Sequence, residues 1–284
     1  MRDRIYAAFH EDIEGLDFTE ADELKARLEG LEPYDEVENG ALHNYRDDFL
    51  VRFIYESNAL EGSTLTLGDT NLVLDGELPE GEGARLSELF AAQGNADGYA
   101  FVEEALASGK TLSEGFIRDL HERTALDSQR RARGTYRVAP ARIIGSPVHP
   151  AEAIEIRGLM ADLLFMCEQA TDAHPIARAA AFHAMFERIH PFPDGNGRVG
   201  RLLINYMLEQ AGYPPIALKN DAHGAYKKAL EDWQAHAEAK PFVELVNGCV
   251  VAELTEQVSI IEQTREAREA LADASAEDKE AYGL

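Results

Sequence analysis

The sequence predicts an almost entirely α-helical fold with one short β-hairpin flap. Apolar residues recur with a helical period along most of the 284 residues, and the alternation typical of strands is scarce. Residues 134–150, GTYRVAPARIIGSPVHP, are the exception, because their proline, glycine and β-branched content suits a short hairpin or extended flap. With 45% hydrophobic residues, the chain can bury a sizeable core among its helices.

The N-terminal helices are predicted from apolar spacing and from stop signals. Amphipathic patterns predict helices over residues 20–31, 44–61, 84–107 and 112–126. The second of these carries a buried stripe made of Phe49, Leu50, Phe53, Ile54 and Leu60. Gly62 follows as a natural helix stop, and a capping box from Thr66 to Asp69 opens a further helix.

The C-terminal half continues the helical pattern. We expect helices over residues 151–169, 175–189, 197–210, 221–237 and 241–270. Pro175 suits a first helical position, and the run AGYPP at 211–215 is a strong stop. The polar residues 271–284 are expected to fray. No Pro/Ser-rich linker separates independent domains.

Composition argues against several classes of function. The 52 Asp and Glu outnumber the 27 Lys and Arg, and the net charge of −25 disfavours nucleic-acid binding. No apolar run is long enough to span a bilayer, and the N-terminus lacks a secretion signal. Cys167 and Cys249 are far apart in apolar helical contexts, so a cytoplasmic protein without disulfides is expected.

Residues 190–201, HPFPDGNGRVGR, join two predicted helices and have the properties of an anion site. Gly195, Asn196 and Gly197 would present free backbone N–H groups where the second helix begins, and its dipole adds positive potential. Arg198 and Arg201 are three residues apart, so they share a helix face and can bind further phosphates. This turn therefore predicts a phosphate cradle.

Two further residues of the turn suit phosphate chemistry. Asp194 can hold a Mg²⁺ that bridges phosphate oxygens, and His190 can take a proton from an incoming hydroxyl. His183, on the same helix as His190, lacks a third ligand at sensible spacing and is predicted to be a core histidine. Residues 195–200 also fit G-x-G-x-x-G, but the dinucleotide fingerprint needs a preceding strand, and a helix is predicted there.

At these residues the sequence resembles the Fic family, whose signature is H-x-F-x-[DE]-G-N-G-R-x-x-R. The matching positions are His190, Phe192, Asp194, Gly195, Asn196, Gly197, Arg198 and Arg201. The likeness extends over about residues 112–247 and includes GTYR at 134–137. It implies a helical catalytic domain over 112–247, an N-terminal helical region over 1–111 and a C-terminal helical extension over 248–284.

The resemblance implies a role for each signature residue. His190 would deprotonate a Ser, Thr or Tyr hydroxyl of a target protein, which attacks the α-phosphate of ATP while pyrophosphate leaves. Asp194 would coordinate Mg²⁺, Arg201 would hold the γ-phosphate, and Phe192 would point into the core. The rest of the anion cradle would be Gly195, Asn196, Gly197 and Arg198.

Outside the signature, the resemblance implies weaker nucleotide contacts. The flap residues that would border the nucleotide are Ile144, Gly145, Ser146 and Pro147, and the flap edge would align the target by strand addition. Tyr226 and Gln234 occupy positions similar to the family's nucleobase contacts, although related members often have Asn where this chain has Gln234.

A second stretch, SNALEG at 57–62, matches the family's inhibitory pattern [ST]-x-x-x-E-[GN]. The resemblance implies an inhibitory helix over about 44–62, with Ser57, Glu61 and Gly62 as its signature. Glu61 would pair with Arg201 and deprive the γ-phosphate of its partner. The position before the core is that of the subclass with an N-terminal inhibitory segment.

The resemblance thus predicts a protein adenylyltransferase that uses Mg-ATP and is restrained by Glu61. Transfer of UMP, phosphocholine or a γ-phosphate, and removal of AMP with Glu61 positioning a water, are alternatives on the same scaffold. A non-catalytic helical interaction protein is the alternative from another class. An unidentified target would dock on the flap, residues 137–150; self-modification and a homodimer stay open.

Overall fold

The computed structural model describes residues 1–10, 13, 15–79, 85–143, 146–220 and 224–282. The helices of its N-terminal half are α1 (Arg2–His10), α2 (Thr19–Gly30), α3 (Glu36–Leu60), α4 (Leu67–Leu74), α5 (Leu86–Ala107) and α6 (Glu114–Thr124). Those of its C-terminal half are α7 (Ile156–Gln169), α8 (Pro175–Ile189), α9 (Asn196–Gln210), α10 (Ala225–His236) and α11 (Lys240–Tyr282). Two 3₁₀ turns, η1 (Arg130–Ala132) and η2 (Ala153–Glu155), complete the described elements, and none of the described helices is long and apolar enough to cross a membrane.

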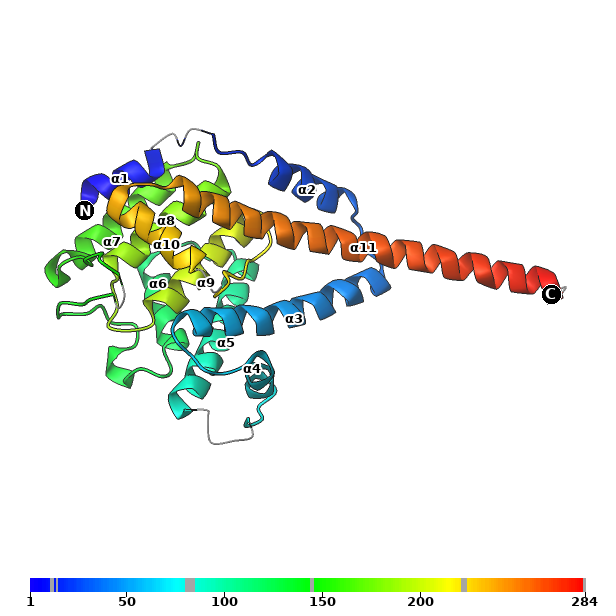
Figure 1. Cartoon of the computed structure of the whole chain (residues 1–284), viewed down its shortest axis with the longest axis horizontal. Coiled ribbons are helices and arrows are strands. Elements are labelled where there is room, and N and C mark those ends of the chain that lie inside the picture. The colour runs from blue at the N-terminus through cyan, green and yellow to red at the C-terminus, as the bar shows by residue number, and fades with distance from the viewer. Residues whose placement is uncertain (11–12, 14, 80–84, 144–145, 221–223, 283–284) are drawn as a thin grey trace.

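The helices α8 and α9 form the centre of the molecule and pack on one another (Figure 1). Most residues of α8 are buried, as expected of a helix that is surrounded by others. In α9 every residue from Asn196 to Leu208 is buried. The turn that joins the two helices, residues 190–195, is therefore held by the core itself.

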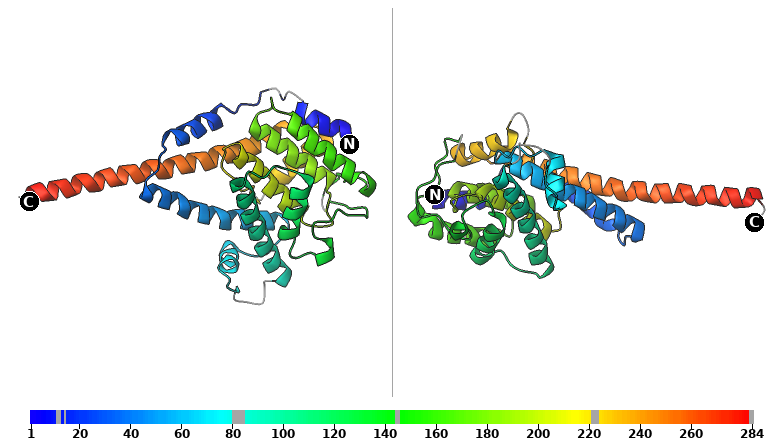
Figure 2. Two further views of the ribbon diagram at one scale, coloured as in Figure 1. Left: turned by 180° about the vertical axis from the view of Figure 1, so that it is seen from behind. Right: turned by 90° about the horizontal axis from the view of Figure 1, so that it is seen from below.

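The long helix α11 runs across the body and extends beyond it, with α2 and α3 on either side (Figures 1 and 2). It passes residue 248 without a break, although the sequence placed a domain boundary there, and it continues to Tyr282 where fraying was expected from 271. That boundary stays a prediction, while the expected end of the helix near 270 was wrong.

The all-α prediction is confirmed, but the predicted β-hairpin is wrong, because no strand occurs in the described parts of 134–150. The segment contains three prolines, Pro140, Pro147 and Pro150, which cannot donate to a strand ladder. Its carbonyls are bound instead by a side chain: the Arg137 guanidinium donates to the carbonyls of Ala139 and Ala151. The result is an irregular loop.

Helix α3 begins eight residues before its predicted start at 44, at a capping box in which Asp35 and Glu38 cap each other's backbone N–H groups. Two ion pairs, one at its first turn and one beyond its midpoint, connect α3 to α11. Arg265 Nε binds Glu38 Oε1 at 2.7 Å, and Arg52 Nη2 binds Glu253 Oε1 at 2.9 Å. The position of α3 over the body is therefore coupled to a helix from the other end of the chain.

We expect Phe53→Ala to lower the free energy of unfolding by about 3–5 kcal/mol, the usual cost of removing a buried phenyl ring. Phe53 is 1% exposed and packs against Phe49 and Tyr99, so its loss leaves a cavity between α3 and α5. Denaturant unfolding measures the change. Val37→Ala, at a 56% exposed position of the same helix, is the control and should change stability by less than about 0.5 kcal/mol.

Candidate active site

His190 lies where α8 ends and its backbone is left-handed, with φ of 52° and ψ of 61°. A non-glycine residue adopts this conformation only when its surroundings hold it there. Arg137 provides that hold, because its Nε donates to the His190 carbonyl at 2.8 Å and its Nη2 to the Ile189 carbonyl at 3.3 Å. Since the same guanidinium binds the loop after α6, one buried arginine fixes the end of α8 to that loop.

The turn after His190 is closed by its own side chains. Asn196 Oδ1 accepts the Phe192 N–H at 2.8 Å, and Asn196 Nδ2 donates to the Phe192 carbonyl at 2.9 Å. Gly195 takes the positive φ of 74° at which α9 begins. Phe192 is fully buried, as predicted, so the turn is anchored in the core.

His121 of α6 also holds this turn in place, through a hydrogen bond to its backbone. Gly134 N–H donates to His121 Nδ1 at 2.8 Å, so the ring proton lies on Nε2, which donates to the Asp194 carbonyl at 3.0 Å. The ring also stacks on Phe192, with 3.8 Å between centroids. Burial lowers the pKa of His121 to about 4, and the imidazole is therefore neutral at ordinary pH.

Arg201 is 2% exposed, and its guanidinium donates hydrogen bonds to the end of α3. Its Nε donates to Ser57 Oγ at 2.8 Å, and its Nη2 donates to the Ser57 carbonyl at 2.8 Å and to Glu61 Oε1 at 2.7 Å. The glycine at 197 leaves room for that carboxylate, since a Cβ there would overlap Glu61 Oε1. The end of α3 thus places a carboxylate at the N-terminus of α9, where backbone N–H groups favour an anion.

Glu61 is ionised in this position. Desolvation raises its pKa, but Arg201, with Arg198 and Lys227, outweighs that influence and keeps the pKa below the usual value. The side chain nevertheless retains 44% exposure, because the mouth of the cradle is open to solvent. Gly62 follows with a φ of 91° and takes the chain away from α3.

Arg198 forms an ion pair with another carboxylate, that of Asp127. Its two terminal nitrogens each lie 2.9 Å from an oxygen of Asp127, in the two-pronged geometry that arginine forms with carboxylates. The guanidinium is buried, and Asp127 joins the segment after α6 to the first turn of α9. The predicted phosphate ligand Arg198 therefore already has a counter-ion in this structure.

The imidazole of His190 is 20% exposed, and burial, the largest influence, lowers its pKa. Glu187, one turn earlier on α8, has Oε2 at 3.8 Å from His190 Nδ1. Burial raises the pKa of Glu187 to about 8, and the charge of Glu61 adds to the rise while Arg201 opposes it. A neutral imidazole and a protonated carboxyl therefore lie together beside the cradle at neutral pH.

Asp194 is exposed on the outer side of the turn. Its Oδ1 accepts the Gly195 N–H at 2.7 Å, and its Oδ2 has only a long contact, 3.4 Å, with Ser128 Oγ. Among the described residues, no group of three or more His, Cys, Asp or Glu side chains could form a complete metal cage. One accessible carboxylate oxygen beside a phosphate cradle suits Mg²⁺, which is usually held by one or two carboxylates together with substrate phosphates.

The residues predicted outside the signature to contact the nucleotide differ in where they lie and in how exposed they are. Ile144 and Gly145 lie outside the described residues, while Ser146 is half-buried and Pro147 exposed in the loop. Tyr226 is buried, its hydroxyl 2.8 Å from His183 Nε2.

Gln234 is also buried, and its Nε2 donates to the Ala184 carbonyl at 2.9 Å. Both predicted base-contacting side chains, Tyr226 and Gln234, pack against α8 here, so their base contacts stay predictions.

Sequence reasoning assigned no role to four residues that shape the site: His121, Asp127, Arg137 and Glu187. Glu187 had a readable signal, because it is the one carboxylate in the largely apolar stretch AAAFHAMFERI. The other three act on residues more than 50 positions away, so local patterns could not pair them with the turn.

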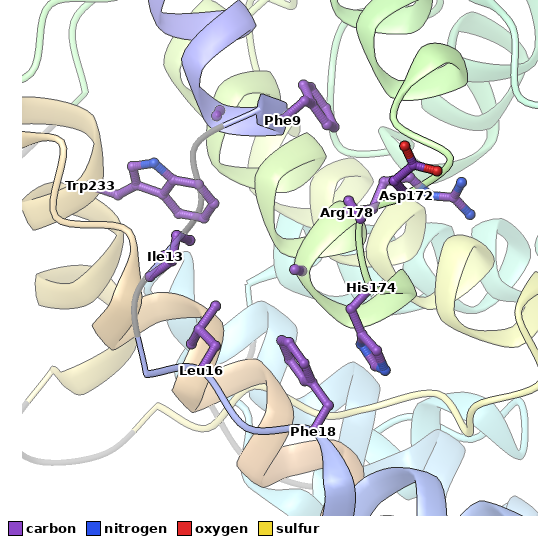
Figure 3. Close-up of a pocket in the computed structure, with 11 residues that line it drawn as sticks. Phe9, Ile13, Leu16, Phe18, Asp172, His174, Arg178 and Trp233 are labelled. Carbon is purple, nitrogen blue, oxygen red and sulfur yellow. The ribbon is translucent and has the colours of Figure 1, made fainter.

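A cavity of about 250 Å³ lies apart from the cradle, beside the segment that connects α1 and α2 (Figure 3). Phe9, Phe18 and Trp233 form its apolar wall, and Asp172 and Arg178 lie on another side. None of the residues predicted for the active site lines it.

Comparison with known proteins finds a family match that includes the turn. Residues 111–208 match the model of the Fic/DOC family. The protein adenylyltransferase Fic of Drosophila melanogaster is 27% identical over 273 residues, which cover 92% of this chain and 54% of the relative. The chain thus spans about half the length of the curated relatives that it matches.

Solved structures give the same result. A Fic-domain-containing signalling protein from Bacteroides thetaiotaomicron superposes with a TM-score of 0.76 at 28% identity, covering 86% of this chain and 97% of that one. A Fic family protein from Desulfovibrio desulfuricans gives a TM-score of 0.68 at 28% identity, with coverages of 87% and 77%. The fold and the turn thus define a helical protein in which a carboxylate lies at the N-terminus of the central helix α9. Residues 111–208 of the chain therefore carry a Fic/DOC family domain.

The neutral His121 makes stability depend on pH. Its pKa is lower in the folded protein than in the unfolded chain, so the unfolded state binds the extra proton as the pH falls from about 6.5 to about 4. This contribution therefore decreases on acidification, by at most about 1.4 kcal/mol per pH unit. His121→Gln keeps a donor and an acceptor but cannot titrate.

We expect the stability difference between wild type and His121→Gln to shrink between about pH 7 and about pH 5. Denaturant unfolding at both pH values measures it. His43→Gln, at a 74% exposed side chain, is the control for the same replacement at the surface. A wild-type and a His121→Gln slope that coincide would contradict the assignment of a buried neutral imidazole.

Proposed function

We propose that this protein transfers AMP from Mg-ATP to a hydroxyl side chain of a target protein, and that Glu61 holds it inactive. The observation that carries the proposal is the carboxylate of Glu61 on Arg201, at the N-terminus of α9. A carboxylate in such a place marks a site built for an anion, and a phosphate has the same preference for helix N-termini and guanidinium groups.

The turn residues suit this reaction in their relative positions. The first N–H groups of α9 have no carbonyl within the helix to bind and can receive the phosphates of the nucleotide. The neutral His190 imidazole can take the proton of the acceptor hydroxyl as that oxygen attacks the α-phosphate and pyrophosphate leaves. Asp194 would hold the Mg²⁺, which when bound neutralises phosphate charge.

Inhibition follows from competition for one guanidinium. Arg201 is buried and already bonded to Ser57 and Glu61, so a γ-phosphate can bind it only if the carboxylate gives way. The exposure of the Glu61 side chain supports such an exchange, because the carboxylate can leave without disrupting the core. The relief of inhibition is then a movement of the end of α3.

The target would dock on the loop 137–150, where Val138 is 92% exposed. Its exposed apolar side chain beside the turn suits a segment of another protein, although the loop forms no strand in its described residues.

Removal of AMP from a modified protein is a second candidate. It is favoured by the solvent access of the Glu61 carboxylate, which could position an attacking water at the same cradle. Incubating an AMP-modified protein with the wild type, and following release of AMP, distinguishes the two directions.

We expect Glu61→Gly to raise incorporation of the α-phosphate of ATP into proteins by roughly a hundredfold, the effect of losing about 2.7 kcal/mol of inhibitory bias. Mass spectrometry of labelled lysate proteins, or of the enzyme itself, identifies the added group and the acceptor residue. Asp47→Asn, at a 66% exposed carboxylate of the same helix, is the control and should stay at the wild-type level.

The double variant Glu61→Gly, His190→Ala should lose this labelling, because no group is left to accept the hydroxyl proton. Labelling that survives in the double variant would contradict the role of His190. A Glu61→Gly protein that labels no better than wild type would contradict the inhibition.

A further inference from the structure

Two carboxyl groups, not one, rest on the glycine face of α9. Gly197, Gly200 and Arg201 share this face because they are three and four residues apart. A Cβ on Gly197 would overlap Glu61 Oε1, and a Cβ on Gly200 would overlap Glu187 Oε1. The two glycines therefore admit one carboxyl from α3 and one from α8 to the helix that carries Arg201.

The carboxyl of Glu187 has an unusual environment. The side chain is 10% exposed, and its Oε1 is buried without a hydrogen-bond partner. The resemblance and the proposed reaction give it no task. The titratable and charged groups that face it from the surrounding helices are Glu61 of α3, His183 and His190 of α8, Arg201 of α9 and Tyr226 of α10.

The charge of Arg201 thus acts on two carboxyl groups, of which Glu61 forms the ion pair with it. Glu61 accepts the hydrogen bond from Arg201 and is the ionised member, while burial raises the pKa of Glu187 to about 8. The two groups titrate as a coupled pair. If Glu61 withdraws, its repulsion of a charge on Glu187 vanishes, and the buried Arg201 is left without a counter-charge.

We propose that Glu187 is the reserve counter-ion of Arg201: it ionises when Glu61 and phosphate are both absent from the guanidinium, and takes a proton from solvent when a nucleotide γ-phosphate binds there. This inference rests on the proposed function, since it needs the cradle to bind nucleotide. Glu187 is a positioning residue, because it balances the charge of Arg201 and holds the guanidinium in place without contacting the reacting atoms.

The proposal predicts the direction of a pH effect. Phosphate binding takes up a proton at Glu187, so nucleotide affinity of the uninhibited protein rises as the pH falls from about 8 toward the lower pKa of the empty cradle. The linked uptake approaches about one proton per nucleotide within that range. A nucleotide without a γ-phosphate does not bind Arg201, so Glu187 stays its counter-ion. Binding of such a nucleotide therefore takes up fewer protons.

The test is calorimetric titration of Glu61→Gly at about pH 7.5 in two buffers of different ionisation enthalpy. The ligand is the Mg²⁺ complex of α,β-methylene-ATP, which AMP transfer cannot cleave, and α,β-methylene-ADP is the matched ligand. We expect proton uptake with the triphosphate, approaching about one, and clearly less with the diphosphate.

Two further variants test whether Glu187 is the residue that takes up the proton. Glu61→Gly with Glu187→Gln should bind the triphosphate without uptake, since glutamine keeps the shape of the protonated acid. Glu61→Gly with Glu209→Gln is the matched control and should keep the uptake. Burial also raises the pKa of Glu209, to about 7, but this carboxyl lies at the far end of α9.

Each outcome is decisive. Triphosphate binding to Glu61→Gly without proton uptake overturns the inference and leaves the proposed function intact, whether or not the Glu187→Gln variant folds. If proton uptake persists in the Glu187→Gln variant, the proton binds another group, and the inference is overturned as well. An absence of any triphosphate binding to Glu61→Gly contradicts the proposed function itself, and the inference falls with it.

Discussion

The buried charge of Arg201 is the constraint on which the site depends. A guanidinium that is taken out of water is costly unless an anion and hydrogen-bond acceptors replace the water. The replacements are Ser57 and Glu61, both from the last turns of α3. The glycine at 197 gives an anion access to this charge and to the N-terminus of α9 together. Under the proposed function, a phosphate satisfies the same charge in the same place, so inhibition and substrate binding are two solutions to one electrostatic requirement.

The two sides of the cradle are held by separate contacts, so under the proposed function Glu61 can move while the turn stays formed. On one side, His121 of α6 and Arg137 of the loop after α6 bind the backbone of the turn. On the other side, α3 is fastened to α11 through Arg52–Glu253 and Glu38–Arg265, at points remote from Glu61. Helix α3 therefore connects these contacts with α11 to the carboxylate of Glu61 at its C-terminal end. The contacts made by α11 are where regulation of the site would be sought.

The sequence predicted those parts of the site that are encoded in local spacing. The helices α8 and α9 and the glycine-rich turn between them follow from apolar periodicity and from the residues at 190–201, and the structure places Glu61 on Arg201. Arg137, His121 and Asp127 were missed because each acts across more than 50 residues, and a single long-range hydrogen bond leaves no periodic trace. The hairpin was predicted from the composition of residues 134–150. In the structure, Arg137 donates to the carbonyls of Ala139 and Ala151, and these contacts hold the segment as an irregular loop. The early start of α3 was missed because Asp35 and Glu38 precede any clear apolar stripe.

The most direct test of the central claim compares Mg-ATP with Mg-ADP as ligands of wild type and Glu61→Gly, with dissociation constants from equilibrium binding in all four combinations. If Glu61 and the γ-phosphate compete for Arg201, the γ-phosphate strengthens binding to Glu61→Gly by roughly tenfold or more, and strengthens binding to wild type far less. The non-additivity of the two changes measures the competition itself. An equal ATP-to-ADP preference in both proteins would contradict the claim, because it would mean that Glu61 and the γ-phosphate do not share a binding partner.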